Sequence, residues 1–489
     1  MVSWTLENSS IFSVTPILQT TTNSTGLISL RKYRPLYFTM SPETIAPSTT
    51  GQVALIPELV PSDALRVFLL QHPGVQFLRL QWQDHSGLLR ARIVPIEHGL
   101  TIAAGERVFH VPPIAFHCIV DNNLLPELDP TGNDWLVPDW SSLKTRPTLD
   151  PLYANVMCKV VEYAPARPGP NWNLCPRRAL ETVCKKAEEM FGVYFLVGFE
   201  VEFEVMKANA EGILVPYSSG FGRFSVCGLR DPCYEHVEEA IRVLLAADVK
   251  IDAFQTEGRR GQYELTLGCL PPLAAVDQLI LVHDTLKRIF GRHGLTVTMS
   301  PRPVESRRQS TGQHTHISIN PPHMQNHFLA GMLQRLPQLC AFCLPYEISY
   351  ERVQPYLAGH LVGWGTENRV VPIRKIKAGH WEVRCIDATA NMYLALAGIF
   401  SAGLLGCTNK EPLLWPDTGI MTDPWPRDAK SLPKNIGDAL DRLEENHKDL
   451  ETMMESGVIQ HYLRVKRTEA AKLRETDVEE TRQLMNELF

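Results

Sequence analysis

GFEVEFEV, residues 198–205, is the stretch that decides how this chain folds. Acidic and apolar side chains alternate strictly along it, which is typical of a β-strand with one polar and one apolar face. Glu200, Glu202 and Glu204 share the polar face. Three like charges on one strand face repel one another unless water or a cation neutralises them.

Three further segments alternate in the same way: Gly261 to Leu267 just after Glu257, His314 to Ile319, and His380 to Cys385. Their alternation places these side chains together on polar faces: Gln262 with Glu264, His314 with His316, and His380 with Glu382 and Arg384. Four such strands in one chain indicate a sheet whose polar face is built around metal ions.

The composition of the 489 residues, 44% apolar and 21% charged, is typical of a globular protein of roughly two to four domains. A net charge of -6 offers no basic excess for nucleic acid. Eleven scattered cysteines favour a reducing compartment, so we expect a cytoplasmic protein. The pair Cys340 and Cys343 lies among apolar residues and predicts a buried helix. The apolar run Met392 to Cys407 is short for a membrane span and predicts a second buried helix.

The chain divides by composition into three parts. Residues 1–58 are rich in Ser, Thr and Pro, so we expect a disordered extension. Late basic residues there resemble a weak transit peptide, which makes a mitochondrial location the alternative, and Met40 is an alternative start. Residues 59–160 predict a β-rich unit whose hairpin, Phe77 to Gln83 and Leu88 to Val94, carries Asp84 at its tip.

The remaining residues, 161–489, mix strands and helices without a strict βαβ rhythm, which favours an α+β fold. Helices are predicted at Pro176 to Phe191, Tyr234 to Ala247, Ala274 to His293 and across the charged stretch from Pro433 to Phe489. Leu440, Leu443, Leu450 and Leu484 form an apolar stripe on that last stretch.

The chemistry of the polar residues indicates phosphoryl transfer from a nucleotide. Carboxylates with an imidazole and no thiolate favour Mg²⁺ or Mn²⁺ over zinc. Four arginines accompany them in the sequence: Arg352, Arg369, Arg374 and Arg384. Guanidinium groups suit phosphate and carboxylate oxygens, and metals with arginines can hold a phosphoryl group during its transfer. A P-loop is excluded because the chain has no GxxxxGK[ST] run.

In the order and spacing of five segments the chain resembles the glutamine synthetase family: GFEVEFEV (198–205), TEGRRGQYE (256–264), TGQHTHIS (311–318), ENRVVPIR (367–374) and EVRCIDATANMYLALAG (382–398). The resemblance implies an N-terminal β-grasp-like domain at 59–160. It implies a catalytic domain at 161–489 with a curved antiparallel sheet flanked by helices. It also implies a ring-shaped homo-oligomer with active sites between subunits.

The resemblance also implies roles for individual residues. One metal set would be Glu202, Glu257 and Glu264, and the other Glu200, His314 and Glu382, leaving Glu204 beside the ligands or in water. Arg369 and Arg374 match phosphate-binding residues, and Asp84 matches an ammonium-site aspartate presented by the adjacent subunit. Substrate binding is expected at Arg352, Arg384, Ser310 and Gly312, and ATP binding at His316, Ser318 and His380.

Several departures from the family pattern fall on the side that chooses the acceptor. Ala358 stands at or near the place of a flap glutamate that takes a proton from ammonium, and an alanine cannot do this. Trp364-Gly365-Thr366-Glu367-Asn368-Arg369 resembles the γ-glutamylpolyamine synthetase-like subgroup, which lacks this glutamate. Arg307-Arg308-Gln309-Ser310 replaces an Asn-Gly pair, His380 replaces an arginine, and no DGSS-type loop is present near Phe109 to Phe116.

The resemblance therefore implies an ATP-dependent carboxylate–amine ligase that forms a γ-glutamyl phosphate and transfers it to an organic amine or ammonia. Glutamate or a related carboxylate would be the acid, with Mg²⁺ or Mn²⁺ as cofactor and no nucleic acid or membrane as partner. Two alternatives stay open at this point: an ammonia-using glutamine synthetase, and a non-catalytic family member with a structural or signalling role.

Overall fold

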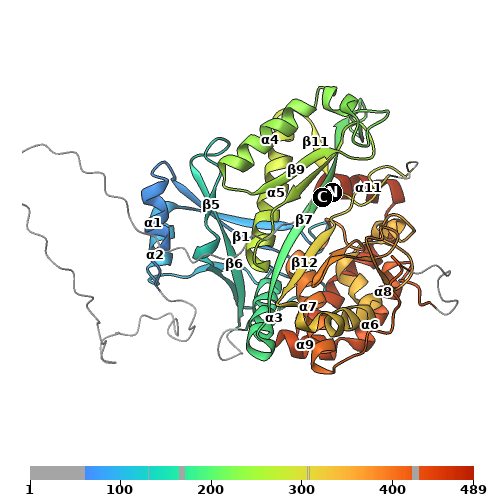
Figure 1. Ribbon diagram of the computed structural model, residues 1–489. Helices are drawn as coiled ribbons and strands as arrows, with labels where there is room; N and C mark the ends of the chain where they lie inside the picture. Colours follow the sequence, from blue (N-terminus) through green and yellow to red (C-terminus); the bar gives the residue numbers. More distant parts are fainter. Residues whose placement is uncertain (1–60, 130, 165–170, 306, 308, 421–428) are drawn as a thin grey trace, which may run out of the picture. The chain divides into compact units, whose positions relative to one another are not determined.

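The computed structural model describes residues 61–129, 131–164, 171–305, 307, 309–420 and 429–489. The extension predicted at residues 1–58 lies outside the described residues. The α+β class is confirmed, because helices and mostly antiparallel strands alternate irregularly and form two sheets (Figure 1). The domain division near residue 160 stays a prediction.

The smaller sheet has the strand order β2-β1-β6-β4-β3, with β5 paired to β6. Its strands are β1 (Phe77–Gln83), β2 (Leu89–Pro95), β3 (Phe109–Val111), β4 (Asn133–Pro138), β5 (Lys144–Thr145) and β6 (Tyr153–Tyr163). Helices α1 (Ala64–Gln71) and α2 (Ile96–Ala103) accompany it. The predicted hairpin is confirmed, since β1 and β2 pair antiparallel along their full lengths.

The larger sheet has the order β13-β14-β15-β12-β7-β10-β9, and β8 and β11 also pair with β7. Its strands are β7 (Tyr194–Ala208), β8 (Leu214–Pro216), β9 (Ile251–Thr256), β10 (Gln262–Leu267), β11 (Thr296–Thr298), β12 (Thr315–Asn320), β13 (Trp364–Thr366), β14 (Ile373–Lys377) and β15 (His380–Val383). All four segments with polar alternation therefore enter one sheet, and the opening stretch forms the middle of its longest strand.

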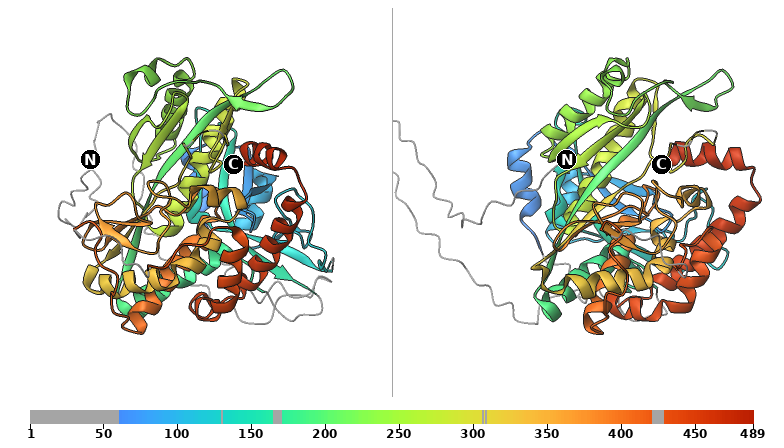
Figure 2. Two further views of the ribbon diagram at one scale, coloured as in Figure 1. Left: turned by 90° about the vertical axis from the view of Figure 1, so that its right-hand side faces the viewer. Right: turned by 45° about the vertical axis from the view of Figure 1, so that its right-hand side comes forward.

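The apolar face of β7 is the centre of the main core. Phe199, Val201 and Phe203 are at most 1% exposed, and each buried phenylalanine contributes roughly 2–3 kcal/mol by leaving water. Phe203 meets the ring of Phe290 from α5 (Pro272–Arg292), and α4 (Tyr234–Ala246) packs beside α5 (Figures 1 and 2). The opposite, polar face of the strand is thereby left for the acids.

The other helices complete the layers around this sheet. They are α3 (Pro176–Phe191), α6 (Gln325–Cys343), α7 (Met392–Thr408), α8 (Ile436–Asn446), α9 (Lys448–Met454), α10 (Val458–Arg474) and α11 (Val478–Leu488). Cys340 and Cys343 are buried in α6, as predicted. The helix predicted from the Met392 run is also confirmed: Gly331 and Gly406 let α6 and α7 touch, because a Cβ on Gly331 would lie 2.2 Å from the Ala402 carbonyl oxygen. Among the described residues, no helix is both long and apolar enough to cross a membrane.

Three histidines join the smaller sheet to helix α10. The His461 ring lies 5.0 Å from that of His85 and 4.8 Å from that of His117, and His461 Nε2 donates to the Phe116 carbonyl at 2.7 Å. Burial lowers the pKa of His461 to about 3 and that of His117 to about 4, and it holds the pKa of His85 well below its ordinary value. The three imidazoles are therefore neutral in the folded protein at pH 7.

This cluster predicts a loss of stability in mild acid. The unfolded histidines have a pKa near 6.5, so below that pH the unfolded chain binds more protons than the folded one. The stability contributed by His85 and His461 is complete above pH 6.5 and falls by about 1.4 kcal/mol per pH unit for each group as the pH drops toward 4.

Denaturant unfolding between pH 7.5 and 5 measures this slope. His461→Gln should flatten it relative to the wild type, while His98→Gln, at an exposed position, should leave it unchanged. Equal slopes in the wild type and His461→Gln would contradict the assignment.

Candidate functional site

The registers of the larger sheet bring the predicted site residues together across neighbouring strands. Glu264 on β10 lies opposite Glu202 on β7, and His316 on β12 lies opposite Glu382 on β15. Arg374 on β14 lies opposite Glu382 from the other side. Because side chains alternate along each strand, the paired residues project from the same face of the sheet.

The tightest group is formed by Glu200, His314 and Glu382. His314 Nδ1 lies 3.0 Å from Glu200 Oε2 and 3.3 Å from Glu382 Oε1. One ligand atom from each of the three residues lies within 4.8 Å of the other two. Two oxygens and one nitrogen at this spacing can hold a divalent cation, as predicted for one of the two metal sets.

Cationic side chains balance the charge of this group. Burial disfavours the charge on Glu200, but hydrogen bonds from His314 and His316 outweigh it and hold the pKa of Glu200 well below its usual range. Burial is likewise outweighed at Glu382, whose pKa is lowered by His314 and Arg384. Arg374 Nη1 also donates to Glu382 Oε2 at 2.9 Å. Both carboxylates are therefore ionised.

The negative charge of the second predicted set is balanced differently. This set consists of Glu202, Glu257 and Glu264. Burial and the charges of Glu200 and Glu202 raise the pKa of Glu264 to about 10. Burial and Glu202 raise the pKa of Glu257 to about 7. Gln255 Nε2 donates to Glu264 Oε1 at 3.1 Å, and among the described residues no ion pair joins Glu264 to a basic side chain. Without a bound cation, protons on Glu264 and Glu257 therefore reduce the repulsion between these carboxyl groups.

The residues fit a hard divalent cation, because several partly buried carboxylates face one another and the raised pKa values of Glu257 and Glu264 show that their negative charges are not fully balanced by basic side chains. Within the described part of the chain, Glu202, Glu257 and Glu264 are not a group whose ligand atoms all lie within 4.8 Å of one another. The structure thus brings the ligand atoms of one predicted metal set together. The second set lies next to the first, but its ligand atoms are farther apart.

The predicted arginines surround the acids and leave donors free. Arg352 is 1% exposed and donates from Nη1 to the Ile386 carbonyl at 2.9 Å, while Arg384 forms an ion pair with Glu382. Arg369 is exposed, and its charge acts on Glu257. Among the described residues, the buried Nε atoms of Arg352, Arg374 and Arg384 have no hydrogen-bond partner. Such unpaired N–H groups suit an incoming carboxylate or phosphate.

The loop of residues 307–312 is fixed against the acids, with Arg308 outside the described residues. Arg307 Nη1 lies 2.6 Å from Glu204 Oε1, and Glu204 is 4% exposed. The expectation that Glu204 lies in water is therefore wrong, while a place beside the ligands fits. The Ser310 carbonyl accepts from Gln262 Nε2 at 3.1 Å. A Cβ on Gly312 would lie 2.5 Å from Arg352 Nη2, so a side chain at this position would displace that guanidinium group.

The residues expected near ATP form a second imidazole pair on β12 and β15. His316 Nδ1 lies 3.1 Å from His380 Nε2, and His316 Nε2 lies 3.1 Å from Glu200 Oε1. Burial and the neighbouring His316 lower the pKa of His380 to about 3, so His380 is neutral. Ser318 lies opposite His380 in the strand register. These three residues therefore continue the acidic cluster along the same face.

Asp84 lies inside the turn of its own hairpin. Its side chain is 0% exposed, and its carboxylate accepts from the Ser86 and Leu88 backbone amides and from Arg90 Nε at 2.7 Å. These bonds close the turn, which is ordinary turn chemistry for an aspartate. A catalytic role for Asp84 at a site shared between subunits stays a prediction.

The acceptor-side residues divide between the core and the surface. Ala358 is 0% exposed, and its amide donates to the Arg352 carbonyl, so its methyl group belongs to the core. Tyr356 in the same turn is instead 65% exposed. Trp364 is buried, and its Nε1 donates to the Trp415 carbonyl, which makes it a packing residue. Sequence patterning identified this segment but not which of its side chains face outward.

Two polar residues of the site were missed. Glu367 forms an ion pair with Arg374, and Gln255 holds Glu264. Gln255 precedes Glu257 by two residues, so the strand alternation contained a signal for it. Glu367 lies inside a quoted segment, but no local pattern distinguishes it from an ordinary surface acid.

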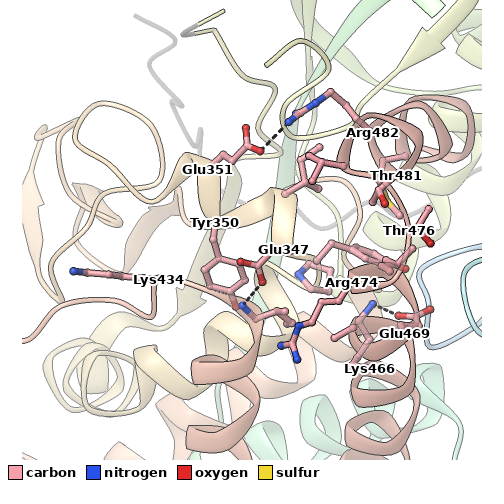
Figure 3. A pocket seen from close by; sticks show the side chains of 18 residues that line it. Glu347, Tyr350, Glu351, Lys434, Lys466, Glu469, Arg474, Thr476, Thr481 and Arg482 are labelled. Atoms are coloured by element: carbon pink, nitrogen blue, oxygen red, sulfur yellow. Dashed lines mark hydrogen bonds and ion pairs between the residues drawn. The ribbon is translucent and has the colours of Figure 1, made fainter. Parts of the chain in front are cut away.

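A separate cavity of about 470 Å³ lies between α10, α11 and the single turn Glu347–Arg352 (Figure 3). Lys466, Glu469 and Arg482 line it together with Tyr350 and Glu351, and none of the acids of the metal sets does. The charged residues in its wall are paired with one another, Lys466 with Glu469 and Arg482 with Glu351. This cavity therefore lies behind the turn that carries Arg352, outside the acidic cluster.

Comparisons with known proteins agree with this geometry. The family profile "Glutamine synthetase, catalytic domain" matches residues 173–484. Protein fluG of Emericella nidulans is 30% identical over 442 residues, which cover 88% of this chain but only 50% of that protein, so the chain spans half the length of that relative. Gamma-glutamylpolyamine synthetase GlnA3 of Streptomyces coelicolor is 30% identical over 377 residues, covering 71% of this chain and 78% of that protein.

Among solved structures, the GmaS/ADP complex aligns with a TM-score of 0.72 at 22% identity, covering 86% of this chain and 98% of that chain. At this identity the likeness shows the fold alone.

The cluster predicts stabilisation by divalent cations. Mg²⁺ or Mn²⁺ should raise the melting temperature of the metal-free wild type, because the cation binds the folded acids and not the unfolded chain. Glu264→Gln mimics the protonated acid, so the metal-free variant should melt within about 2 °C of the wild type but gain much less from the cation. Glu211→Gln, at an exposed position, is the matched control. Equal gains in Glu264→Gln and the wild type would show that Glu264 is not a ligand.

Proposed function

Because the chain belongs to the glutamine synthetase family, we propose that it is an ATP-dependent carboxylate–amine ligase that prefers an organic amine to ammonia. The observation that carries the proposal is the group Glu200, His314 and Glu382, flanked by Arg374 and Arg384 with unpaired Nε atoms. A site with metal ligands beside anion donors suits a phosphoryl group and the carboxylate that receives it.

Two cation positions are proposed. Glu200, His314 and Glu382 would hold one ion, and Glu202, Glu257 and Glu264 the other. When bound, Mg²⁺ or Mn²⁺ would neutralise the negative charge of the ATP phosphates. His316 and Ser318 on β12 and His380 on the neighbouring β15 lie next to the first position and would contact the nucleotide.

Two pairs of arginines would bind different groups of the substrates. Arg369 and Arg374 would hold the phosphoryl group during transfer, and Arg352 and Arg384 the carboxylate of glutamate or a related acid. The γ-carboxylate oxygen attacks the terminal phosphorus of ATP, ADP leaves, and a γ-glutamyl phosphate forms. The amine nitrogen then attacks the acyl carbon, and inorganic phosphate leaves in place of a poorer leaving group.

Preference for an organic amine rests on the segment after Arg352. Residues 353–359 contain no carboxylate, so nothing in this turn can attract or deprotonate an ammonium ion. The exposed Tyr356 offers an apolar ring with a hydroxyl in the same turn. The similarity to GlnA3, named a γ-glutamylpolyamine synthetase, agrees with an amine acceptor. We also expect a ring-shaped homo-oligomer, as the family resemblance implies.

ATP-dependent phosphate release with glutamate, Mg²⁺ and a panel of primary amines tests the proposal. At least one organic amine should support faster release than ammonium at equal low millimolar concentration. Comparable turnover with ammonium and none with any amine would contradict it. Glu264→Ala should abolish release in every case, because one cation position loses a ligand, and activity that persists without Mg²⁺ or Mn²⁺ would count against the metal assignment.

Gly312→Ala tests the carboxylate position. The added methyl group must displace Arg352 Nη2, so kcat/KM for the acid should fall roughly 10- to 100-fold, while KM for ATP changes little. Gly291→Ala is the matched control, since a Cβ there meets nothing within 4 Å. An unchanged KM for glutamate in Gly312→Ala would show that Arg352 does not bind the acid substrate.

A further inference from the structure

Arginines gather beside the second proposed cation position, where three stretches of the chain contact one another. These stretches are residues 221–224, 257–262 and 307–310. Phe221 forms a β-bridge with Arg259, and Gln262 Nε2 donates to the Ser310 carbonyl at 3.1 Å. The described residues of the three stretches include four arginines: Arg223, Arg259, Arg260 and Arg307.

Close packing fixes the three stretches against each other. Arg259 Nε donates to Gln309 Oε1 at 2.9 Å, which joins the second stretch to the third. A Cβ on Gly222 would lie 2.4 Å from the carbonyl carbon of Arg259, so the backbones of the first two stretches touch. Because the second stretch begins with Glu257, the arginines lie at the edge of the acidic cluster.

Arg223 is held in an uncommon backbone conformation at this edge. Its φ is +44°, and that of Phe224 is +60°. The Arg223 amide donates to the Glu257 carbonyl at 2.5 Å, and the Phe224 amide donates to the Thr256 carbonyl at 3.1 Å. A positive φ at a residue other than glycine costs free energy and persists where the surrounding structure enforces it, often at functional sites. These bonds fix the backbone of Arg223 to that of a proposed metal ligand.

The charges of two of these arginines are not paired. Arg307 forms an ion pair with Glu204, and Arg260 forms one with Asp231. Across the part of the chain that the structure describes, Arg223 and Arg259 form no ion pair with an acidic side chain. Arg223 is also exposed, so its guanidinium group is open to an incoming molecule. When cations occupy the neighbouring carboxylates, this edge of the site is positively charged.

We propose that the acceptor of this ligase is an amine that also carries a carboxylate, as an amino acid does, and that Arg223 binds this carboxylate. The inference rests on the proposed function, since it names the acceptor class of the same site. A guanidinium group can hold a carboxylate through two parallel N–H donors. The arginine pairs assigned to the acid substrate and to the phosphoryl group do not include Arg223, which leaves it for the third reactant.

The same charges disfavour a polyamine as the acceptor. A second ammonium group would meet arginines at this edge, and residues 353–359 offer no carboxylate to receive it. Phe221 and Phe224 are 70% and 67% exposed beside Arg223, so apolar surface is present for the hydrocarbon that joins the amine to the carboxylate.

The experiment compares acceptors in which a carboxylate replaces a methyl group, using phosphate release by the full chain with ATP, glutamate and Mg²⁺. L-Alanine is compared with isopropylamine, β-alanine with propylamine, and γ-aminobutyrate with butylamine and with the diamine putrescine. At least one aminocarboxylate should have a kcat/KM about 10-fold or more above that of its matched monoamine, and γ-aminobutyrate should exceed putrescine.

Variants of Arg223 test the residue itself. Arg223→Gln should lower kcat/KM for the preferred aminocarboxylate about 10-fold or more, through KM, and leave the matched monoamine and the KM for glutamate within about twofold. Arg223→Lys keeps the charge and should retain part of the preference. Arg66→Gln, at an exposed position on α1, is the matched control and should behave as the wild type.

Three results would overturn the inference, and they separate it from the proposed function. Monoamines or putrescine that react as fast as every aminocarboxylate, or faster, would overturn the inference and leave the ligase proposal standing. A rise in the KM for glutamate alone in Arg223→Gln would overturn it as well, because Arg223 would then bind the acid substrate. No turnover with any organic amine would overturn the proposed function and this inference together.

Discussion

Carboxylates that face one another across a single sheet are the constraint on which this structure depends. Glu200, Glu202 and Glu264 project from two adjacent strands, and their partial burial limits screening by water. At one end of the row, hydrogen bonds and ion pairs from His314, His316 and the arginines at Glu382 stabilise the negative charge. At the other end, no ion pair to a basic side chain is formed by Glu264 among the described residues, and burial with the neighbouring acids Glu200 and Glu202 raises its pKa to about 10. The negative charge around Glu382 is thus balanced by the chain itself, whereas the charge around Glu264 requires protons or an added cation.

This asymmetry gives the two halves of the site different properties. The half around Glu382 is rigid before any ligand arrives, because each carboxylate oxygen there has a basic partner. The half around Glu264 changes its charge when a cation replaces protons. The turn after Arg352 adds no further acid, so under the proposed function selection of the acceptor would rest on shape and on exposed groups such as Tyr356.

Local periodicity was sufficient to predict the four strands that carry the polar residues of the site, because a period of two fixes which side chains share a face. The faces of β7, β10, β12 and β15, and the grouping of Glu200 with His314 and Glu382, followed from it together with the family resemblance. Contacts between distant segments could not be read in this way. The pairing of Glu204 with Arg307 and the burial of Asp84 depend on how loops pack, which no short pattern encodes. Ala358 shows the same limit, since an alignment position does not reveal which way a methyl group points.

Proton release on metal binding distinguishes acids that are protonated in the metal-free protein from acids that are already ionised. Titration of the metal-free protein with Mg²⁺ at pH 7, in buffers of different ionisation enthalpy, counts the protons displaced. With pKa values of about 10 for Glu264 and about 7 for Glu257, binding should release between about one and two protons, and fewer in Glu264→Gln. Binding of Mg²⁺ without proton release would show that the acids are already ionised, and would contradict the account of a sheet face that holds protons in place of a cation.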